Sequence, residues 1–374
     1  MRLSEFDYVL PGERIAEAPL ARRDASRMML LDRRTCSWED GWIRELPERL
    51  RGDELLVVNN ARVIPARLFG RRAGVGAEPA GQSRKSRIRR EFLQSEIEVL
   101  LVRRLAPDRW EALVRPGRKV RTGELIFFGS GLQAEVLGRG TFGLRELRFT
   151  AEGKIEETLE RIGHVPLPPY IHRADQPADR ERYQTIFARE GFAAAAPTAG
   201  LHFSAELVER LARRGIELAE LTLEVGLGTF QPIRTERVED HPIHRETYEI
   251  PRPAAEAIAR AKRDGRPVVA VGTTVVRALE DAALKCERGG NGDGPAGAGS
   301  RPWLAGRAEA DLYIYPGYRF RVVDQLLTNF HLPKSSLLVM VAALAGRKFL
   351  LDAYRHAVGE GYRFYSYGDC MFIR

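Results

Sequence analysis

Short apolar runs and longer stretches of helical periodicity alternate along much of the chain. Residues 55–58 (LLVV) and 268–271 (VVAV) are fully apolar and predict buried strands. Residues 155–162 and 253–264 repeat their apolar side chains at helical spacing, and the second stretch begins with Pro and precedes Gly, as helices often do. Strand and helix in alternation indicate an α/β fold with a mostly parallel sheet. Further predicted elements are a helix that Ser204 caps and that ends near Gly215, a strand over 216–225 and a helix over 274–285.

The stretch between residues 67 and 150 has a different pattern. Short strand candidates separated by turns that contain Gly and Pro predict a small antiparallel barrel or sandwich. The candidates are residues 96–102, 110–114, 124–128, 133–137 and 144–149. We therefore expect an inserted β-barrel domain at 67–150 and a discontinuous α/β domain formed by 1–66 and 151–374. Low-complexity residues 73–86 and 289–300 predict disordered surface loops.

A polar elbow interrupts the apolar pattern near the end of the chain. The apolar run before residue 328 stops at Thr328, Asn329, Phe330 and His331, and Ser335 then precedes a long apolar segment. This order predicts a buried strand, a turn and a buried helix whose N-cap is Ser335. Asn and His at such a position lie where α/β proteins place their ligands.

A second polar turn follows the small apolar residues 193–196. Thr198 and His202 stand there before the predicted N-cap at residue 204, and the small side chains allow close approach of a ligand to the backbone. A tight turn with a packed His202 explains the pattern equally well.

Polar residues also follow the predicted strand 268–271. Gly272, Thr273 and Thr274 open a helix that carries Arg277, and together they could hold a carboxylate or a phosphate. The simpler alternative is that Thr273 or Thr274 only caps the helix.

Two histidines lie close together in the segment DHPIHRE, which spans residues 240–246. His241, His244 and Glu246 could mimic metal ligands, but Pro242 argues against the helical spacing that such sites prefer. Acid–base chemistry near neutral pH is the better interpretation, and we expect no metal.

Charge and cysteine content limit the classes of function. The net charge is +8, but residues 71–90 hold seven Lys and Arg against the single Glu78 and so contribute +6 of it. Basicity is therefore a weak argument that the whole surface binds nucleic acid. The three cysteines lie far apart, which indicates neither a disulfide framework nor a zinc site. A charged N-terminus and short apolar runs predict no signal peptide and no membrane span, so we expect a soluble cytoplasmic protein.

Other motifs are weak or missing. Residues 226–230 (GLGTF) follow a predicted strand and resemble the glycine turn of a Rossmann-type methyltransferase, but Gln231 and Pro232 stand where a helix should begin. No P-loop and no nucleophile-elbow sequence occurs. A Rossmann-type S-adenosylmethionine-dependent RNA methyltransferase stays an alternative, as does a non-catalytic RNA-binding module that uses the inserted barrel.

The order of these segments is more specific than any one of them. In sequence they read NNARVIPARLFG, GHVPLPPYI, AAPTAGLHF, VGLGTFQPI, DHPIHRE, VGTTVVRALE, IYPGY, VVDQLLTNFHLPKSSLLVMVAALAG and YSYGDCMFI. This series resembles the S-adenosylmethionine:tRNA ribosyltransferase-isomerase family of queuosine biosynthesis from residue 1 to residue 374, apart from the two low-complexity loops.

The resemblance implies a fold and an activity. The fold would be a barrel-like α/β main domain with an inserted small antiparallel β-barrel domain. The activity would transfer and isomerise the ribosyl moiety of S-adenosylmethionine onto 7-aminomethyl-7-deazaguanine at the wobble position of the tRNAs for Asp, Asn, His and Tyr. Epoxyqueuosine-tRNA forms, and adenine and methionine leave. S-adenosylmethionine is then a substrate, no cofactor is implied, and we expect a monomer.

The resemblance also assigns roles to the polar segments. The acid–base candidates are His202, His331, His241 and His244. An anion would be bound by Gly272, Thr273, Thr274 and Arg277. Ribose or base edges would be held by Asn59, Asn60, Arg62, Thr198, Thr328 and Asn329. Bases would stack on Tyr315, Phe330 and Tyr367.

Three features depart from the family pattern. Glu224 stands where we expect His, and Ala61 stands where we expect Thr. The basic segment 71–90 is an apparent insertion, which either contacts RNA phosphates or is a solvated loop.

Overall fold

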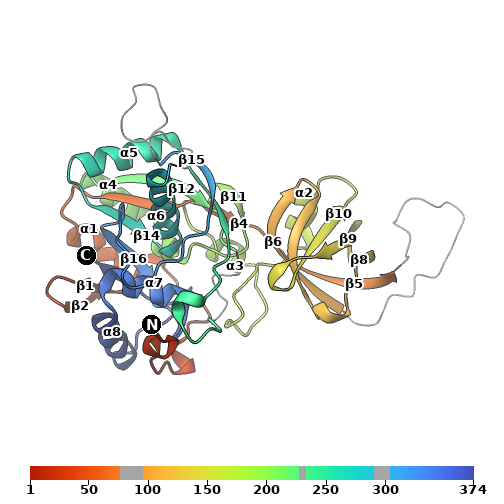
Figure 1. The fold of residues 1–374 in the computed structure, drawn as a ribbon, viewed down its shortest axis with the longest axis horizontal. Coiled ribbons are helices and arrows are strands. Elements are labelled where there is room, and N and C mark those ends of the chain that lie inside the picture. Colours follow the sequence, from red (N-terminus) through yellow and green to blue (C-terminus); the bar gives the residue numbers. More distant parts are fainter. Residues whose placement is uncertain (76–95, 227–232, 290–303) are drawn as a thin grey trace, which may run out of the picture.

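The computed structural model describes residues 1–75, 96–226, 233–289 and 304–374. Two lobes stand side by side (Figure 1), an α/β lobe that contains both ends of the chain and a closed β-barrel. The expected fold class, α/β with a small antiparallel β-barrel, is confirmed. No helix in the described ranges is long and apolar enough to cross a membrane.

A mixed sheet of nine strands forms the centre of the α/β lobe. In spatial order its strands are β15 (Gly306–Ala310), β13 (Glu246–Ile250), β12 (Glu217–Leu223), β3 (Leu55–Asn59), β14 (Val268–Val271), β16 (Gln325–Asn329), β17 (Cys370–Ile373), β1 (Arg27–Asp32) and β2 (Ser37–Trp42). The strands β12, β3, β14 and β16 are parallel, as expected. The flanks are not, because β13 and β15 return antiparallel on one side, and β17 pairs antiparallel with β16 on the other.

Helices cover both faces of this sheet, which explains the continuous apolar strand at residues 55–58. Leu55 and Val57 belong to the core on the face of α5 to α8, whereas Leu56 and Val58 belong to the core on the face of α1 and α4. The helices are α1 (Leu46–Arg49), α4 (Ala205–Arg213), α5 (Arg252–Arg263), α6 (Thr273–Glu287), α7 (Ser336–Ala345) and α8 (Arg347–Gly359).

Two of the predicted helix starts are confirmed at atomic detail. The Ser204 hydroxyl accepts from the backbone N–H of Leu207 at 3.1 Å, and the Ser335 hydroxyl accepts from that of Leu338 at 3.2 Å. Each hydroxyl satisfies an N–H group that the helix itself leaves unpaired.

The barrel contains all five strand candidates of the inserted region. Its strands are β5 (Arg67–Val75), β6 (Glu96–Ala106), β7 (Arg109–Arg115), β8 (Glu124–Gly129), β9 (Leu132–Arg139) and β10 (Leu144–Thr150). Residues 73–75 are part of β5 and not of a disordered loop; the remainder of that predicted loop and residues 290–300 lie outside the described residues. Leu159 of α2 (Ile155–Ile162) packs into the barrel core, so this packing unit extends beyond residue 150.

Smaller elements complete the chain. They are β4 (Ala61–Val63), β11 (Glu190–Ala193), α3 (Asp179–Arg182) and the 3-10 turns η1 (Leu3–Phe6), η2 (Gly12–Arg14), η3 (Arg23–Ala25), η4 (Ile43–Glu45), η5 (Gly117–Lys119), η6 (Thr141–Gly143), η7 (Thr198–His202) and η9 (Val238–Asp240). Strands β4 and β11 pair in parallel as a separate two-stranded sheet.

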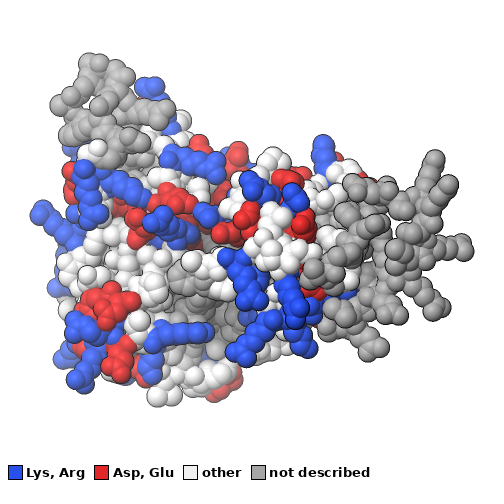
Figure 2. Space-filling view, turned by 45° about the vertical axis from the view of Figure 1, so that its right-hand side comes forward, with Lys and Arg blue, Asp and Glu red and all other residues white. Residues whose placement is uncertain are grey.

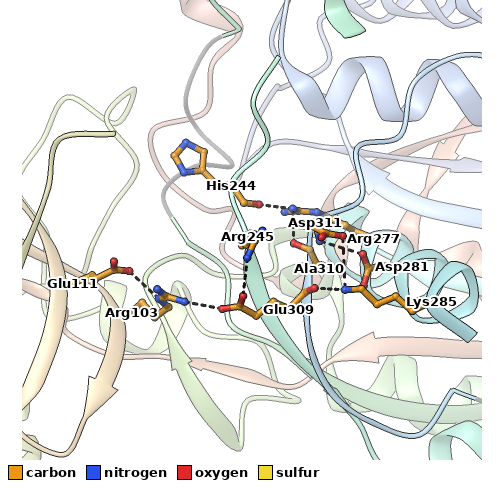
Figure 3. A network of polar contacts seen from close by, with 10 residues as sticks. All are labelled: Arg103, Glu111, His244, Arg245, Arg277, Asp281, Lys285, Glu309, Ala310 and Asp311. Atoms are coloured by element: carbon orange, nitrogen blue, oxygen red, sulfur yellow. Dashed lines mark hydrogen bonds and ion pairs between the residues drawn. The ribbon is translucent and has the colours of Figure 1, made fainter. Parts of the chain in front are cut away.

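Polar contacts (Figure 3) and one aromatic contact described below join the lobes. Arg103 of β6 forms ion pairs with Glu111 of the barrel and with Glu309 of β15, both at 2.8 Å. Arg245 approaches the other oxygen of Glu309 at 3.6 Å. The Trp110 ring, which is buried, meets the edge of Phe192 at a centroid distance of 5.6 Å. Because the ion pairs are partly exposed, each contributes about 0–1 kcal/mol.

Candidate active site

Polar turns converge at the carboxyl ends of β14 and β16. They enclose a hollow of about 600 Å³, called here the central hollow. The polar side chains and turn residues that line it include Thr198, Gly272, Thr273, Thr274, Thr328, Asn329, His331, Ser335, Tyr365 and Ser366. The carboxyl edge of a parallel sheet is the usual ligand position in α/β folds, and here several of the predicted site residues share one space.

Asn329, at the end of β16, has its amide held in one orientation. Its Nδ2 donates to the carbonyl of Tyr365 at 3.0 Å and to Nε2 of His202 at 3.2 Å, so both amide hydrogens are used. The side chain is buried, and its Oδ1 has no hydrogen-bond partner within the described part of the chain. A buried acceptor without a donor is costly, so Oδ1 is suited to accept a hydrogen bond from a ligand.

His202 fixes the orientation of this amide through a hydrogen bond. Because the amide nitrogen of Asn329 only donates, Nε2 of His202 accepts, and Nδ1 carries the hydrogen that is donated to the Ser26 hydroxyl at 3.0 Å. Burial, with a further contribution from the charge of Arg363, lowers the pKa of His202 to about 4. The ring is therefore neutral at pH 7 and fixed in one tautomer.

His331 lines the central hollow directly. Its Nε2 lies 3.0 Å from the Thr328 hydroxyl, and its backbone N–H donates to the Tyr354 hydroxyl at 3.0 Å. Burial lowers the pKa of His331 to about 3, so this ring is also neutral at pH 7. Imidazole groups commonly transfer protons in enzymes, and this one lies at the wall of the hollow.

The turn before α6 forms another wall. Gly272 has φ +96°, a conformation that favours glycine, and α6 begins at Thr273 without a side-chain cap. The capping alternative for Thr273 and Thr274 is therefore wrong. The Asn59 amide instead approaches the Thr274 hydroxyl at 3.5 Å from the end of β3. The uncapped N-terminus of α6 brings a partial positive charge to the hollow.

Arg277, which the sequence suggested for an anion site with Gly272, Thr273 and Thr274, makes its hydrogen bonds to protein groups. Its guanidinium is buried and donates to Glu246 Oε2 at 2.5 Å, to the carbonyls of Leu312 and Ala310 at 3.2 and 2.9 Å, and to the carbonyl of His244. Figure 3 shows it directed at these backbone groups. With its donors used in this way, Arg277 fixes the segments around residues 244–246 and 310–312.

Two further hollows adjoin the central one. The second hollow, of about 460 Å³, shares Thr273 and Thr274 with the central hollow and also contains His244 and Arg277. The interlobe hollow, of about 1100 Å³, shares His244 with the second hollow and lies between the barrel and the α/β lobe. Burial lowers the pKa of His244. The three hollows therefore share lining residues one after another from the centre of the α/β lobe to the barrel.

Two of the residues predicted to stack on bases lie in packed clusters. Phe330 is among the residues that line the central hollow, but its ring is fully buried and packs against Tyr354, Tyr362 and Phe364. The Tyr367 hydroxyl donates to Asp179 at 3.0 Å in a separate buried cluster. Large apolar rings were packed into the core, although the sequence alone did not reveal this.

Other predicted residues lie away from the central hollow. Asn60 donates to Glu220 at 3.2 Å and accepts from Thr222 at 2.7 Å, and Arg62 forms an exposed ion pair with Glu160 at 2.6 Å. These contacts commit both side chains to the protein itself, so the prediction that they hold a ribose or base edge in the hollow is not supported by their position.

His241 and Tyr315 flank Tyr313, with ring centroids 5.5 and 5.7 Å from it. Neither lines the central hollow. Burial and the nearby His244 lower the pKa of His241.

Glu224 follows β12 and lines the interlobe hollow. Burial raises the pKa of this carboxyl group. The next part of the glycine turn, residues 227–232, lies outside the described residues, so the structure does not describe the methyltransferase-like motif.

Sequence reasoning missed Tyr365, Ser366 and Ser26. Tyr365 has φ +75°, unusual for a residue other than glycine, and its carbonyl orients Asn329. Ser366 also lines the hollow, and both residues lie in the segment YSYGDCMFI, whose polar start was the available signal. In the described ranges no group of three or more His, Cys, Asp and Glu side chains could hold a metal ion.

Known proteins of one family match this chain over its full length. A family model described as queuosine biosynthesis protein matches residues 3–373. The S-adenosylmethionine:tRNA ribosyltransferase-isomerases of Solibacter usitatus and Desulfitobacterium hafniense are 52% and 47% identical to this chain, with 100% of each protein covered.

A solved structure adds a fold-level match. The crystal structure of S-adenosylmethionine tRNA ribosyltransferase from Thermotoga maritima is 36% identical, with a TM-score of 0.53 over 99% of this chain and 100% of that one. The expected resemblance is thereby confirmed, and the chain belongs to the queuosine biosynthesis protein family.

Proposed function

We propose that this protein transfers and isomerises the ribosyl moiety of S-adenosylmethionine onto 7-aminomethyl-7-deazaguanine in tRNA, with release of adenine and methionine. The observation that carries the proposal is the identity of 52% over the whole chain with a protein named for this activity. The Rossmann-type methyltransferase alternative is not favoured, because no relative cited above bears such a name.

The central hollow is the proposed site for S-adenosylmethionine. Oδ1 of Asn329, buried and without a partner among the described residues, accepts a hydrogen bond from a donor of the substrate such as a ribose hydroxyl. The hydroxyls of Thr198, Thr273 and Thr274 supply further polar contacts, and the N-terminus of α6 favours the carboxylate of the methionine part.

Proton transfers are assigned to the histidines by their position. The reaction needs a proton removed from the ribose carbon beside the sulfonium and a proton supplied to the departing adenine. His331 is neutral and lines the central hollow, so it is the proposed proton carrier there. His244 lies in the two adjoining hollows, closer to the barrel, and is the proposed carrier for the attacking amine. His202 positions Asn329.

The proposal also covers the tRNA substrates, the oligomeric state, the localisation and the cofactor requirement. The substrates are the tRNAs for Asp, Asn, His and Tyr, and the modified base occupies the wobble position. The enzyme acts as a monomer in the cytoplasm and uses S-adenosylmethionine as a substrate, without a further cofactor. The names of the relatives support tRNA and S-adenosylmethionine as the substrates.

One incubation tests the proposal. The purified protein is mixed with S-adenosylmethionine and tRNA that carries 7-aminomethyl-7-deazaguanine, and the small molecules are separated by chromatography. We expect adenine and methionine in equal amounts and only with the modified tRNA. S-adenosylhomocysteine would indicate a methyltransferase, and tRNA binding without consumption of S-adenosylmethionine would indicate a binding module.

A further inference from the structure

One end of the barrel carries a cluster of exposed cations, called here the basic rim. It consists of Arg115, Arg118, Lys119, Arg121 and Arg139, which lie in and around η5 and at the end of β9. All five side chains are exposed, and none forms an ion pair with a carboxylate in the described part of the chain. Elsewhere on the barrel, Arg103, Arg109 and Arg148 each pair with a glutamate.

A buried arginine fixes the two loops of the basic rim to each other. Arg145 donates to the carbonyl of Gly117 at 3.0 Å and to those of Gly143 and Leu144 at 3.1 and 2.9 Å. It also pairs across the strands with Arg139, so two cations lie close together. A fold gains no stability from unpaired cations placed together, because like charges repel, and an anionic partner is the usual reason for such an arrangement.

The rim adjoins the route to the central hollow. Thr141 and Leu144, at the loop that Arg145 fixes, line the interlobe hollow together with His244. That hollow shares His244 with the second hollow, and the second hollow shares Thr273 and Thr274 with the central one. In the space-filling view, Lys and Arg side chains gather at the centre of the face, where the two lobes meet, whereas blue and red alternate over much of the α/β lobe (Figure 2).

The interlobe hollow itself is unsuited to phosphate. Its lining includes Glu224 and three carboxylates, Glu111, Glu246 and Glu309, that are paired with Arg103, Arg245 and Arg277. The cations of this hollow are therefore already engaged by carboxylates, whereas the carboxylate oxygens can accept hydrogen bonds from donors of a base. A base with donor groups therefore fits inside, and a phosphate backbone fits outside on the basic rim. The two surfaces together match a nucleotide that is turned out of an RNA strand.

We infer that the basic rim of the barrel binds the phosphate backbone of the RNA whose base enters the interlobe hollow. The inference rests on the proposed function and locates the RNA partner of that site. Binding of this kind depends on charge, not on sequence, and weakens as salt rises, because each phosphate contact releases a condensed counterion.

The test compares two pairs of charge removals. The rim pair, Arg118→Ala with Lys119→Ala, removes two cations from the rim. The control pair, Arg213→Ala with Lys348→Ala, removes two exposed cations from α4 and α8. These helices lie on the side of the α/β lobe away from the barrel (Figure 1). The Kd for modified tRNA is measured from 50 to 300 mM KCl. At 0.15 M we expect the rim pair to bind on the order of tenfold more weakly and its slope of log affinity against log salt to fall by roughly 1–2.

The control pair should match the wild type, and the KM for S-adenosylmethionine should change in neither variant. Equal changes in both pairs, or no change in the rim pair, would overturn the inference. If the rim pair unfolds early, Lys119→Gln alone decides the question, with about half the change of slope. Release of adenine by the wild type tests the proposed function separately, so failure of the rim leaves that result intact.

Discussion

The central hollow and the basic rim differ in the charge and in the burial of their side chains. The hollow is lined by the amide of Asn329, several hydroxyls and the neutral ring of His331, most of them buried, whereas the rim consists of exposed cations without acidic partners in the described structure. A buried neutral site places donors and acceptors where water does not compete. Exposed charge acts over longer distances and attracts a polyanion before contact. The difference suggests that the α/β lobe performs the chemistry and the barrel retains the RNA.

The largest effect should follow the loss of His331. His331→Ala removes the proposed proton carrier and should lower kcat by about 10²–10⁴-fold, measured as adenine release at saturating substrates. The tRNA affinity should stay unchanged. His241→Ala is the matched control because His241 lies outside the hollow, and it should retain most of the rate. Equal rates for the two variants would remove His331 from the mechanism.

The barrel also contains a buried charge pair whose role is structural. Arg72 donates to Glu124 at 2.6 and 3.0 Å, and both side chains are buried. Arg72→Met leaves the carboxylate unpaired and should cost about 3–5 kcal/mol of unfolding free energy, measured with urea. The double variant Arg72→Met with Glu124→Gln should recover much of this loss. A single variant as stable as the wild type would show that the pair contributes little.

A smaller effect should mark the loss of the acceptor at Asn329. Asn329→Leu keeps the approximate volume but leaves a substrate donor unpaired, so kcat/KM for S-adenosylmethionine should fall roughly 10–100-fold. The Kd for tRNA should not change, in contrast to the rim variants. Asn329→Asp keeps an acceptor oxygen but loses the donors to His202 and Tyr365, which tests whether orientation matters. Normal kcat/KM for the Leu variant would contradict the assignment.

The smallest effect concerns pH and stability. The pKa of His202 is about 4 in the folded chain and near 6.5 when unfolded, so the unfolded state binds the proton first as pH falls. Stability from the neutral ring is therefore present above pH 6.5 and is lost as pH falls toward 4, by up to about 1.4 kcal/mol per pH unit. His202→Gln cannot titrate, and the difference in unfolding free energy from the wild type should shrink over this range. A constant difference would contradict burial of a neutral ring.

The elements of the fold were largely predictable because their signals are local. Strand 55–58 is apolar on both sides because both faces are covered, and Ser204 and Ser335 cap their helices through their own side chains. Strands β1 and β17 were not predicted, although residues 28–31 and 370–373 are apolar. They lie far apart in the sequence and pair with each other in the sheet, and no local pattern reports such a partner.

The site was predictable only in part, for the same reason. Asn329, at the end of β16, and Thr274, in the first turn of the helix that follows β14, line the hollow because the topology brings the ends of these strands together. The contacts of Arg277 and Phe330 within the protein were not predictable, because a buried ion pair and a packed ring have the same sequence signature as a ligand contact. Tyr365 was missed because its contribution comes from a backbone carbonyl, which any residue type can supply.

The contacts between the two lobes affect how a salt titration of tRNA binding is interpreted. The ion pair of Arg103 with Glu309 is partly exposed and is screened at physiological salt, where the Debye length is about 8 Å. The edge-to-face contact of Trp110 with Phe192 is apolar and does not respond to screening in this way. Addition of KCl should therefore weaken the binding of nucleic acid while the barrel keeps its contact with the α/β lobe. The dependence of the tRNA affinity on KCl then reports counterion release and not separation of the lobes.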